Sequence, residues 1–558
     1  MAQAFRLRVK LRRTAVALAE AVRPASAALK RCALTVAIVT CTVVLSAQPQ
    51  HGSRATGSEA ATARRFAAIR NQPLQLLAFL RQMPKGGDLH NHLSGAIYAE
   101  SYLRWAADDK SCLVTATMVI VMGPCDAGAG RPPVVDVLQN ATLFNQAVDA
   151  MSMRNWDRSL NGHDHFFAAF GKLGPTSTRT GDMLAEVMAR AAGEHVSYLE
   201  LMLTPAAAAT ARLAREVGWN PDLPALRNRL LAAGLRDAVI AEGTQRLDAA
   251  ETRQRELLHC VRLRSPESSR AAAGQVRLRS PESSRAAAGQ VRFRSPESSR
   301  ATAGQVRLRS PESSRAAPGR AAERPDPGCA VTVRYVAQVA RSAAPEQVFA
   351  QMLAGFELTG ADPRVVSLNL VQPEDDPNAI GNFMLEMEML DFLHGLYPRT
   401  PITLHAGELA EGMVPPDALR FHIRQSVEKG HARRIGHGVS LINEDDPFGL
   451  LREMAARKVL VEIALTSNDL ILGIKGKRHP LKLYLQHGVP VAIVTDDYGV
   501  SRSTHTEEFL KAVQEHDLDY LTLKRLARNS LEFSFADVAT KMRLTAALES
   551  AFTAFERR

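Results

Sequence analysis

Short apolar runs alternate along this chain with longer stretches whose apolar residues recur at helical spacing. The runs with the length of buried strands span residues 88–93, 196–204, 330–340, 365–372, 401–408, 433–441, 459–468 and 490–497. Amphipathic patterns typical of helices lie between them, for example at 224–257, 345–357, 382–396, 416–429, 447–457 and 505–515. Because the eight runs are too apolar for a sheet with one solvent face, the alternation predicts an α/β fold, a (β/α)8 TIM barrel.

A doubly wound open sheet would produce a similar pattern of strands and helices. No glycine-rich phosphate loop follows the first predicted strand, which argues against a nucleotide-binding sheet of that kind. We therefore expect a barrel over residues 84–558, preceded by a helical extension at 48–83.

Residues 1–47 combine a basic stretch with the apolar run CALTVAIVTCTVVLSA, from Cys32 to Ala47. The run is short for a membrane span, and the stretch SAQPQ at its end resembles a cleavage region. We interpret the segment as an export signal, which predicts a periplasmic or extracellular protein with no membrane span after cleavage. The alternative is an uncleaved membrane anchor.

A fifteen-residue repeat interrupts the predicted barrel at 261–320. VRLRSPESSR begins at Val261 and returns at 276, at 291 with Phe293 in place of leucine, and at 306. The repeat has almost no apolar side chains to bury, so we expect a disordered insertion. It could act as a basic arm for polyanions, although a repeat that is simply tolerated on a surface loop is the simpler interpretation.

The net charge of +11 is unevenly distributed. Residues 1–47 carry a net charge of +7 and residues 261–320 a net charge of +9, which leaves −5 for the rest of the chain. A mildly acidic body argues against a nucleic-acid partner.

Four of the six cysteines lie outside the predicted signal, as two local pairs, Cys112 with Cys125 and Cys260 with Cys329. An even number of cysteines in an exported protein indicates disulfides. None of the four has the spacing of a cysteine zinc site.

Polar residues gather at the carboxyl ends of the predicted strands: His90, His92, His405, Glu408, His437, Ser467, Asn468, Asp496 and Asp497. In a barrel these ends meet at one mouth, where active sites lie. His90 and His92 are two residues apart, so on a strand both side chains point to the same face. Such a pair can bind a metal or be a hydrogen-bonded pair in the core. Adding His405 and Asp496 supplies the ligands of a catalytic Zn²⁺ site, in which one zinc ion per chain would lower the pKa of a water molecule.

Three further side chains at this mouth can act on a substrate. Glu408 can donate a proton to a ring nitrogen, although an acid at a helix N-terminus would look the same. His437, between two glycines, suits a base or a group that orients the attacking water; a structural histidine in a turn is the alternative. Asp497 can face the substrate, or cap an Asx turn.

Five motifs carry a family resemblance: MPKGGDLHNHLSGA, LHAGE, RIGHG, LTSN and VTDDYGVSR. In this order they resemble the motifs of adenosine deaminases in the amidohydrolase superfamily, and most closely those of the exported, growth-factor-related branch and its bacterial relatives. The resemblance covers roughly residues 75–550 apart from the repeat. It implies a purine nucleoside as substrate and water attack at C6, which converts adenosine or 2′-deoxyadenosine to the inosine product and ammonia.

The resemblance also implies a role for each residue of the site. The zinc ligands fall on His90, His92, His405 and Asp496. The proton donor to purine N1 falls on Glu408, the histidine that orients the attacking hydroxide on His437, and the aspartate that binds purine N7 on Asp497. The family further suggests homodimers, and a small disulfide-closed excursion at 112–125.

The chain departs from the family pattern at Ser94, where the well-known cytosolic members have an aspartate that helps to bind the ribose. We expect Ser94 to line the substrate site, but the sugar preference is open. The loop 370–376 resembles the family's purine-edge loop, and no single contact can be assigned there.

Two other functions fit the same motifs. One is deamination of adenine, AMP or a modified adenosine; a phosphate-preferring enzyme should have basic residues near the mouth, and Lys475, Lys477 and Arg478 are candidates. The other is an inactive nucleoside-binding or signalling protein. The presence of Glu408, His437 and all four ligands argues against the inactive protein.

Overall fold

The computed structural model describes residues 57–157, 162–260 and 324–558. The chain divides into two compact units, residues 1–60 and 61–558. Of the first unit only residues 57–60, the start of helix α3, are described, and all other elements below belong to the second unit. The predicted signal at 1–47 and the predicted insertion at 261–320 lie outside the described residues.

Eight parallel strands close into a barrel. One sheet has the order β1-β4-β5-β6 and the other the order β10-β9-β8-β7. Parallel bridges join the two sheets on both sides, Leu368 with Ile402 and Asn91 with Asp496. The strands are β1 (Gly86–His92), β4 (Val196–Leu203), β5 (Thr332–Ala340), β6 (Val365–Val371), β7 (Thr403–Ala406), β8 (Arg434–His437), β9 (Leu460–Ile463) and β10 (Val491–Ile493). The predicted (β/α)8 barrel is confirmed.

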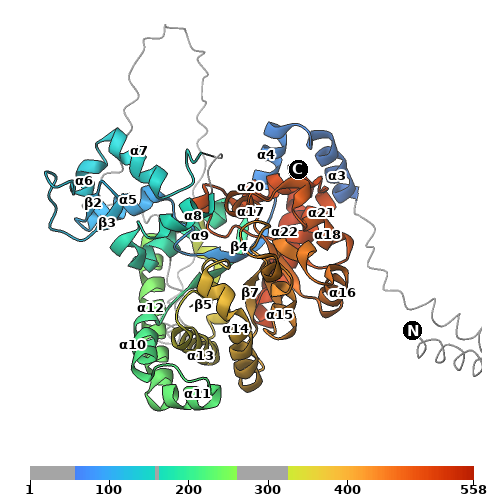
Figure 1. The fold of residues 1–558 in the computed structure, drawn as a ribbon. Coiled ribbons are helices and arrows are strands. Elements are labelled where there is room, and N and C mark those ends of the chain that lie inside the picture. Colours follow the sequence, from blue (N-terminus) through green and yellow to red (C-terminus); the bar gives the residue numbers. More distant parts are fainter. Residues whose placement is uncertain (1–56, 158–161, 261–323) are drawn as a thin grey trace, which may run out of the picture. The chain divides into compact units, whose positions relative to one another are not determined.

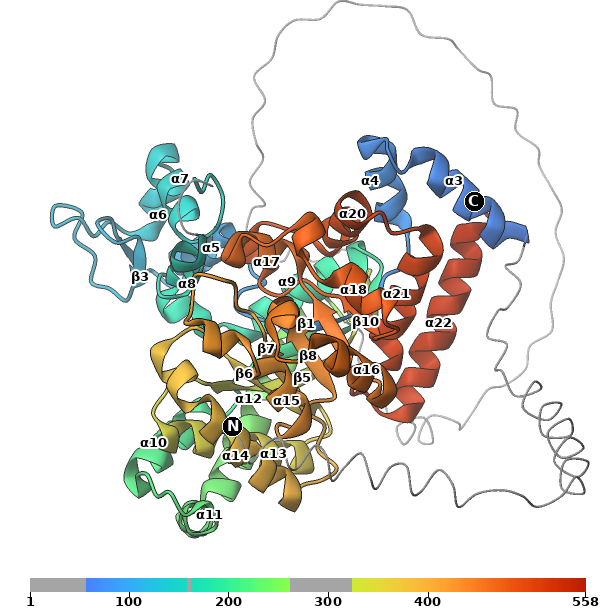
Figure 2. The ribbon, with the colours of Figure 1, turned by 45° about the vertical axis from the view of Figure 1, so that its right-hand side comes forward.

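Helices surround the strands (Figures 1 and 2). Two of them form the N-terminal helical region, α3 (Gly57–Ile69) and α4 (Pro73–Gln82). The others are α5 (Ala99–Asp108), α6 (Val134–Val137), α7 (Ala141–Ala150), α8 (Gly162–Phe170), α9 (Thr180–Gly193), α10 (Ala207–Val217), α11 (Leu223–Ala232), α12 (Leu235–Leu257), α13 (Pro345–Ala361), α14 (Pro377–Leu396), α15 (His422–Glu428), α16 (Pro447–Arg457), α17 (Leu465–Leu472), α18 (Leu481–Gln486), α19 (Tyr498–Ser501), α20 (His505–His516), α21 (Tyr520–Glu532) and α22 (Val538–Glu556). None of the helices in the described ranges is long and apolar enough to span a bilayer.

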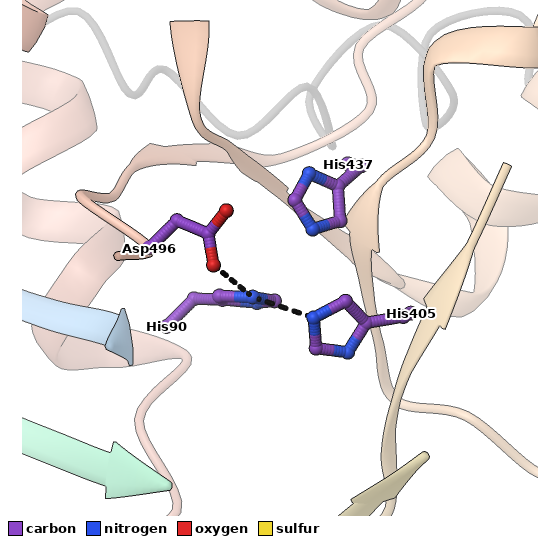
Figure 3. Close-up of side chains that lie close together, drawn as sticks. All are labelled: His90, His405, His437 and Asp496. Carbon is purple, nitrogen blue, oxygen red and sulfur yellow. Dashed lines mark hydrogen bonds and ion pairs between the residues drawn. The ribbon is translucent and has the colours of Figure 1, made fainter. Parts of the chain in front are cut away.

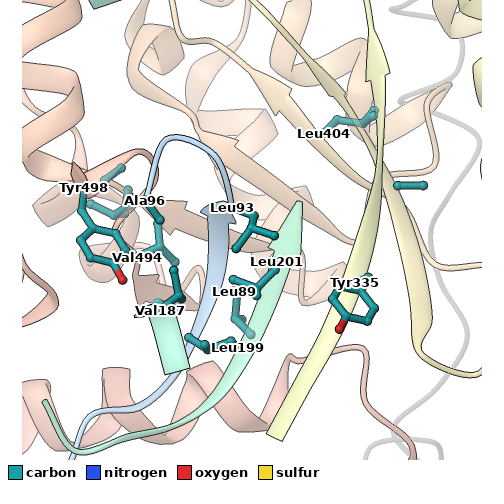
Figure 4. Packing of buried hydrophobic residues seen from close by; sticks show 14 of the residues in the cluster. Leu89, Leu93, Ala96, Val187, Leu199, Leu201, Tyr335, Leu404, Val494 and Tyr498 are labelled. Atoms are coloured by element: carbon teal, nitrogen blue, oxygen red, sulfur yellow. The ribbon is translucent and has the colours of Figure 1, made fainter. Parts of the chain in front are cut away.

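Apolar side chains fill the space between strands and helices. Figure 4 shows part of this packing, in which Leu89 of β1 and Leu199 and Leu201 of β4 belong to one buried cluster. Every residue of β1, β6, β7, β8, β9 and β10 is buried. Burial on both faces explains why these strands have no polar alternation in the sequence.

The boundaries of several predicted elements are wrong. The strands predicted at 401–408 and 490–497 end at Ala406 and Ile493. The strand predicted at 433–441 ends at His437, and a 3₁₀ turn follows it. The strand predicted at 459–468 ends at Ile463, so the LTSN motif begins helix α17 and does not end a strand. The helix predicted at 224–257 is two helices, because Gly234 takes a left-handed conformation with φ of 85° between them.

A small excursion separates α5 from α9. It contains the antiparallel pair β2 (Cys112–Val114) and β3 (Val119–Val121), with α6 and α7, and lies at the left of Figures 1 and 2. A disulfide joins Cys112 to Cys125, whose Cα atoms are 5.4 Å apart. A second disulfide joins Cys260 to Cys329, on either side of the predicted insertion.

Candidate metal centre and active site

Three histidines and one aspartate from three segments meet at the carboxyl ends of the barrel strands. Nε2 of His405 lies 3.1 Å from Nε2 of His90 and 3.2 Å from Nε2 of His92. Oδ1 of Asp496 lies 3.4 Å from Nε2 of His90 and 3.3 Å from Nε2 of His92. Figure 3 shows His90 between Asp496 and His405, with His437 beside them.

These separations match a tetrahedral metal site. With zinc–nitrogen bonds of 2.0–2.1 Å, the ligand atoms of a tetrahedron lie about 3.3–3.4 Å apart. His437 also lies within reach of the group, as an alternative to His92. The set His90, His92, His405 and Asp496 is the better one, because Nε2 of His92 lies at tetrahedral spacing both from Nε2 of His405, at 3.2 Å, and from Oδ1 of Asp496, at 3.3 Å.

Side chains behind the three histidines orient the rings. Nδ1 of His90 lies 2.7 Å from a carboxylate oxygen of Glu462, and Nδ1 of His405 lies 3.0 Å from Oδ1 of Asn369. Both contacts place the ring proton on Nδ1 and leave Nε2 free for a metal. The side-chain amide of Gln338 contacts Nδ1 of His92 at 2.9 Å.

Asp496 is held in its ionised form. Burial alone would raise its pKa, but the hydrogen bond from His90 and the surrounding imidazoles outweigh burial and hold the pKa far below its usual range. The hydroxyl of Ser467 also donates to Oδ2 of Asp496 at 2.6 Å. For His90, burial acts to lower the pKa, but Asp496 and Glu462 raise it to about 10. The carboxylates thus favour a positive charge at this position, which a divalent cation would supply in place of the proton.

A chain of hydrogen bonds fixes the tautomer of His437. The backbone N–H of Leu481 donates to Nδ1 of His479 at 3.2 Å, so the neutral ring of His479 carries its proton on Nε2. That proton is donated to Oδ1 of Asn468 at 3.1 Å, and Nδ2 of Asn468 donates to Nδ1 of His437 at 3.0 Å. Burial lowers the pKa of His437 to about 4, so at neutral pH the ring is uncharged and its proton lies on Nε2.

Glu408 lies in the same cavity as the metal ligands and is buried. Burial, reinforced by Asp496 and Glu374, raises its pKa well above the usual range and so favours the protonated carboxyl group. The backbone N–H groups of Gly407 and Glu408 both donate to Glu374, at 3.1 and 2.7 Å. Glu374 therefore fixes the turn that aims Glu408 into the cavity.

The catalytic cavity has a volume of about 380 Å³. His92, His405, Glu408, Asp496 and Asp497 line its metal side, and Ser94, Thr204 and Gln338 line another side. Helix α8 contributes an aromatic wall of Phe166, Phe167 and Phe170. This combination of apolar wall and convergent polar groups suits a flat heterocycle with polar substituents.

Two glycines make room for functional side chains. A Cβ atom on Gly95 would lie 1.5 Å from Oδ1 of Asp497, and a Cβ atom on Gly436 would lie 2.7 Å from Cε1 of His90. Burial, with the charge of Asp496 beside it, raises the pKa of Asp497 well above its usual range. Because Gly436 has no Cβ atom, the ring of His90 can lie against its backbone.

The adenosine deaminase family model matches residues 317–551. This match covers less than half of the chain, and it shows a similarity of residues 317–551 to adenosine deaminases. Among curated relatives, an adenosine deaminase of Enterococcus faecalis is 33% identical over 153 residues, which cover 27% of this chain and 42% of that protein. An aminodeoxyfutalosine deaminase of Streptomyces avermitilis is 36% identical over 120 residues, 21% of this chain and 33% of that protein. The chain thus spans about two fifths or less of the length of these relatives.

Two solved structures superpose on this chain at low sequence identity. An N6-mAMP deaminase of Arabidopsis has a TM-score of 0.48 and 18% identity, with 85% of this chain and 99% of that chain covered. An amidohydrolase of Burkholderia ambifaria with bound Zn has a TM-score of 0.46 and 15% identity, with 91% and 96% covered.

The structure brings the predicted site residues together. His92, Ser94, His405, Glu408, Asp496 and Asp497 line one cavity, and the rings of His90 and His437 pack against His405. Sequence reasoning missed the side chains behind them: Glu462, Asn369, Gln338, Glu374 and His479. Two of these left a signal, because Glu462 and Asn369 are polar residues inside apolar strands. His479 left none, since only the fold brings it to Asn468. The predicted basic candidates Lys475, Lys477 and Arg478 line neither this cavity nor the larger one beside it.

Proposed function

We propose that this protein is a zinc-dependent hydrolase that converts adenosine or 2′-deoxyadenosine to inosine or 2′-deoxyinosine and ammonia. One observation carries the proposal. Glu408, a carboxyl group with a raised pKa, lines the same cavity as His92, His405 and Asp496, and with His90 these ligands have atoms 3.1–3.4 Å apart. The aromatic wall of α8 supplies a surface for a purine ring.

The residues fit zinc by their chemistry as well as their spacing. Three imidazole nitrogens and one carboxylate oxygen are ligands that Zn²⁺ prefers. Zinc held by His90, His92, His405 and Asp496 would lower the pKa of a water molecule towards neutrality.

Glu408 supplies the proton that the attacked ring needs. When water oxygen adds to C6 of the purine, the C6–N1 double bond becomes a single bond and N1 must take up a proton. A protonated Glu408 can donate it. Loss of ammonia then restores the double-bond character at C6 as a carbonyl.

His437 and Asp497 orient the reactants. Nε2 of His437 has no hydrogen-bond partner in the described part of the chain, so its N–H can donate to the oxygen of the attacking water, and the ring does not start as a base. Asp497, whose pKa is raised, can donate to purine N7, which only accepts hydrogen bonds.

The direct test is to follow the loss of adenosine absorbance with purified protein, with and without a chelator. We expect conversion to inosine that the chelator abolishes and added zinc restores. A zinc-loaded protein that converts none of adenosine, 2′-deoxyadenosine, adenine and AMP would refute an enzymatic role.

We also propose that the protein is exported. The two disulfides support this, because such bonds persist in oxidising compartments. Peptide mapping of protein recovered from its native compartment, without reduction, should find both linked pairs. Free thiols at Cys112 and Cys125 would contradict the proposal.

A further inference from the structure

A second cavity, of about 590 Å³, adjoins the catalytic cavity. The two share three lining residues, Ser94, Thr204 and Gln338. Gln338 contacts the ring of His92, so the shared wall lies one side chain from the metal ligands. A substrate whose base lies in the catalytic cavity could therefore extend past Ser94 into this second cavity.

Charged side chains in the second cavity come from two helices. Arg246 and Arg253 lie two turns apart on α12, and hence on one face, while Arg179 and Asp182 lie at the start of α9. With three positive side chains and one negative, the cavity lining has a net charge of +2.

The arginines are only loosely engaged by their present partners. Arg179 faces Asp109 at 3.4 Å and Asp182 at 3.8 Å. Arg253 faces Asp182 at 3.3 Å and Glu256 at 3.9 Å, and Arg246 faces Glu242 at 3.4 Å. The side chains of Arg246 and Arg253 are 56% and 47% exposed. Guanidinium groups in long, shared ion pairs keep N–H donors available for an oxyanion.

We propose that this arginine annex, formed by Arg179, Arg246 and Arg253, binds the phosphate of a 6-aminopurine nucleoside monophosphate. The inference rests on the proposed function, because it assumes that the base occupies the catalytic cavity. A dianionic phosphate matches the net charge of the cavity lining, and guanidinium groups bind phosphate oxygens in pairs. The residue at the junction, Ser94, is neutral and adds no repulsion to a passing phosphate.

The test compares kcat/KM for AMP and for adenosine in the zinc-loaded protein and in two matched variants. Arg246→Ala removes a partly exposed annex arginine in an i,i+4 ion pair at 3.4 Å. Arg212→Ala removes an arginine of α10 with the same pair geometry, 60% exposed and outside both cavities. One lost hydrogen bond to a charged group corresponds to about a tenfold effect.

We expect the wild type to deaminate AMP, and Arg246→Ala to lower the ratio of kcat/KM for AMP over adenosine about tenfold. Arg212→Ala should leave the ratio unchanged, and added salt should lower it in the wild type. Turnover of adenosine without AMP, or the same ratio in Arg246→Ala, would overturn the annex and leave the proposed function standing.

If neither purine is deaminated, the proposed function fails, and calorimetry with AMP then tests the annex by itself. Binding that weakens about tenfold in Arg246→Ala but not in Arg212→Ala would support it. Absent or unaltered binding would overturn it.

Discussion

At the scale of single residues, His437 depends on two side chains that lie behind it. Its neutral ring has its proton on Nε2 because Asn468 donates to Nδ1, and the orientation of Asn468 is fixed in turn by His479. Burial lowers the pKa of His479 to about 3, so this ring is neutral throughout the working range of pH. The chemistry of the site therefore reaches beyond the residues that line it.

Replacing His479 should disturb the reaction without touching the substrate. In His479→Leu the amide of Asn468 loses its donor and can turn, so His437 should populate both tautomers and kcat should fall about tenfold with little change in KM. His479→Gln retains an N–H donor and should keep kcat near that of the wild type. Nitrogen NMR of the histidine rings gives the tautomer directly; a single Nε2–H form and full kcat in His479→Leu would refute the relay.

The space that the His90 ring occupies also depends on a single residue, Gly436. A Cβ atom at Gly436 would lie 2.7 Å from Cε1 and 3.0 Å from Nδ1 of His90. Gly436→Ala should therefore displace this ring and weaken zinc binding at least about tenfold, measured by competition with a chromogenic chelator. The control is Gly381→Ala on α14, where an added Cβ meets nothing within 4 Å. Equal zinc affinity in the two variants would show that His90 is not a ligand.

At the scale of elements, helix α14 contains a buried glutamate, Glu386, whose carboxyl group has no hydrogen-bond partner among the described residues. Burial raises its pKa from 4.5 to about 8. Because the folded pKa is raised, the contribution of Glu386 to stability is fully present below pH 4.5. It is lost as the pH rises to about 8, by about 1.4 kcal/mol per pH unit.

Glu386→Gln removes this titration. The free energy of unfolding of the variant should therefore rise relative to the wild type between pH 5 and pH 8, by on the order of 4 kcal/mol. Urea denaturation of both proteins at the two pH values measures the difference. A difference that does not change with pH would mean that Glu386 is as easily ionised in the folded protein as in the unfolded chain.

The strands and helices also show how much of the fold and of the site could be predicted from the sequence. All eight barrel strands were predictable, because burial on both faces gives uninterrupted apolar runs. Their carboxyl ends were predictable where polar residues follow at once, as at His90 and His405. The start of α17 was not, since the apolar residues before Ser467 continue from strand into helix. Glu374 could not be found, because its role depends on backbone N–H groups that only the folded chain brings near it.

At the scale of the whole molecule, the disulfide Cys260–Cys329 joins the two ends between which the predicted insertion lies. Its Cα atoms are 5.6 Å apart, and β5 begins three residues after Cys329. The barrel thus has a covalent closure at this point that does not depend on residues 261–320.

Deleting residues 261–320 should therefore leave kcat/KM for adenosine within about twofold of the full-length value, since no catalytic group is removed and the disulfide still closes the barrel. The same deletion in a Cys260→Ser, Cys329→Ser background controls for the covalent closure. A loss of activity in the deletion variant with the disulfide intact would assign a working role to the repeat.

The central claim is that Glu408 supplies the proton while four other residues hold the metal. Glu408→Gln is nearly the same size but cannot donate a carboxyl proton, so its turnover of adenosine should fall about a thousandfold. Its zinc content, measured on the same sample, should stay at one ion per chain. Full turnover in Glu408→Gln, or loss of its zinc, would contradict this account.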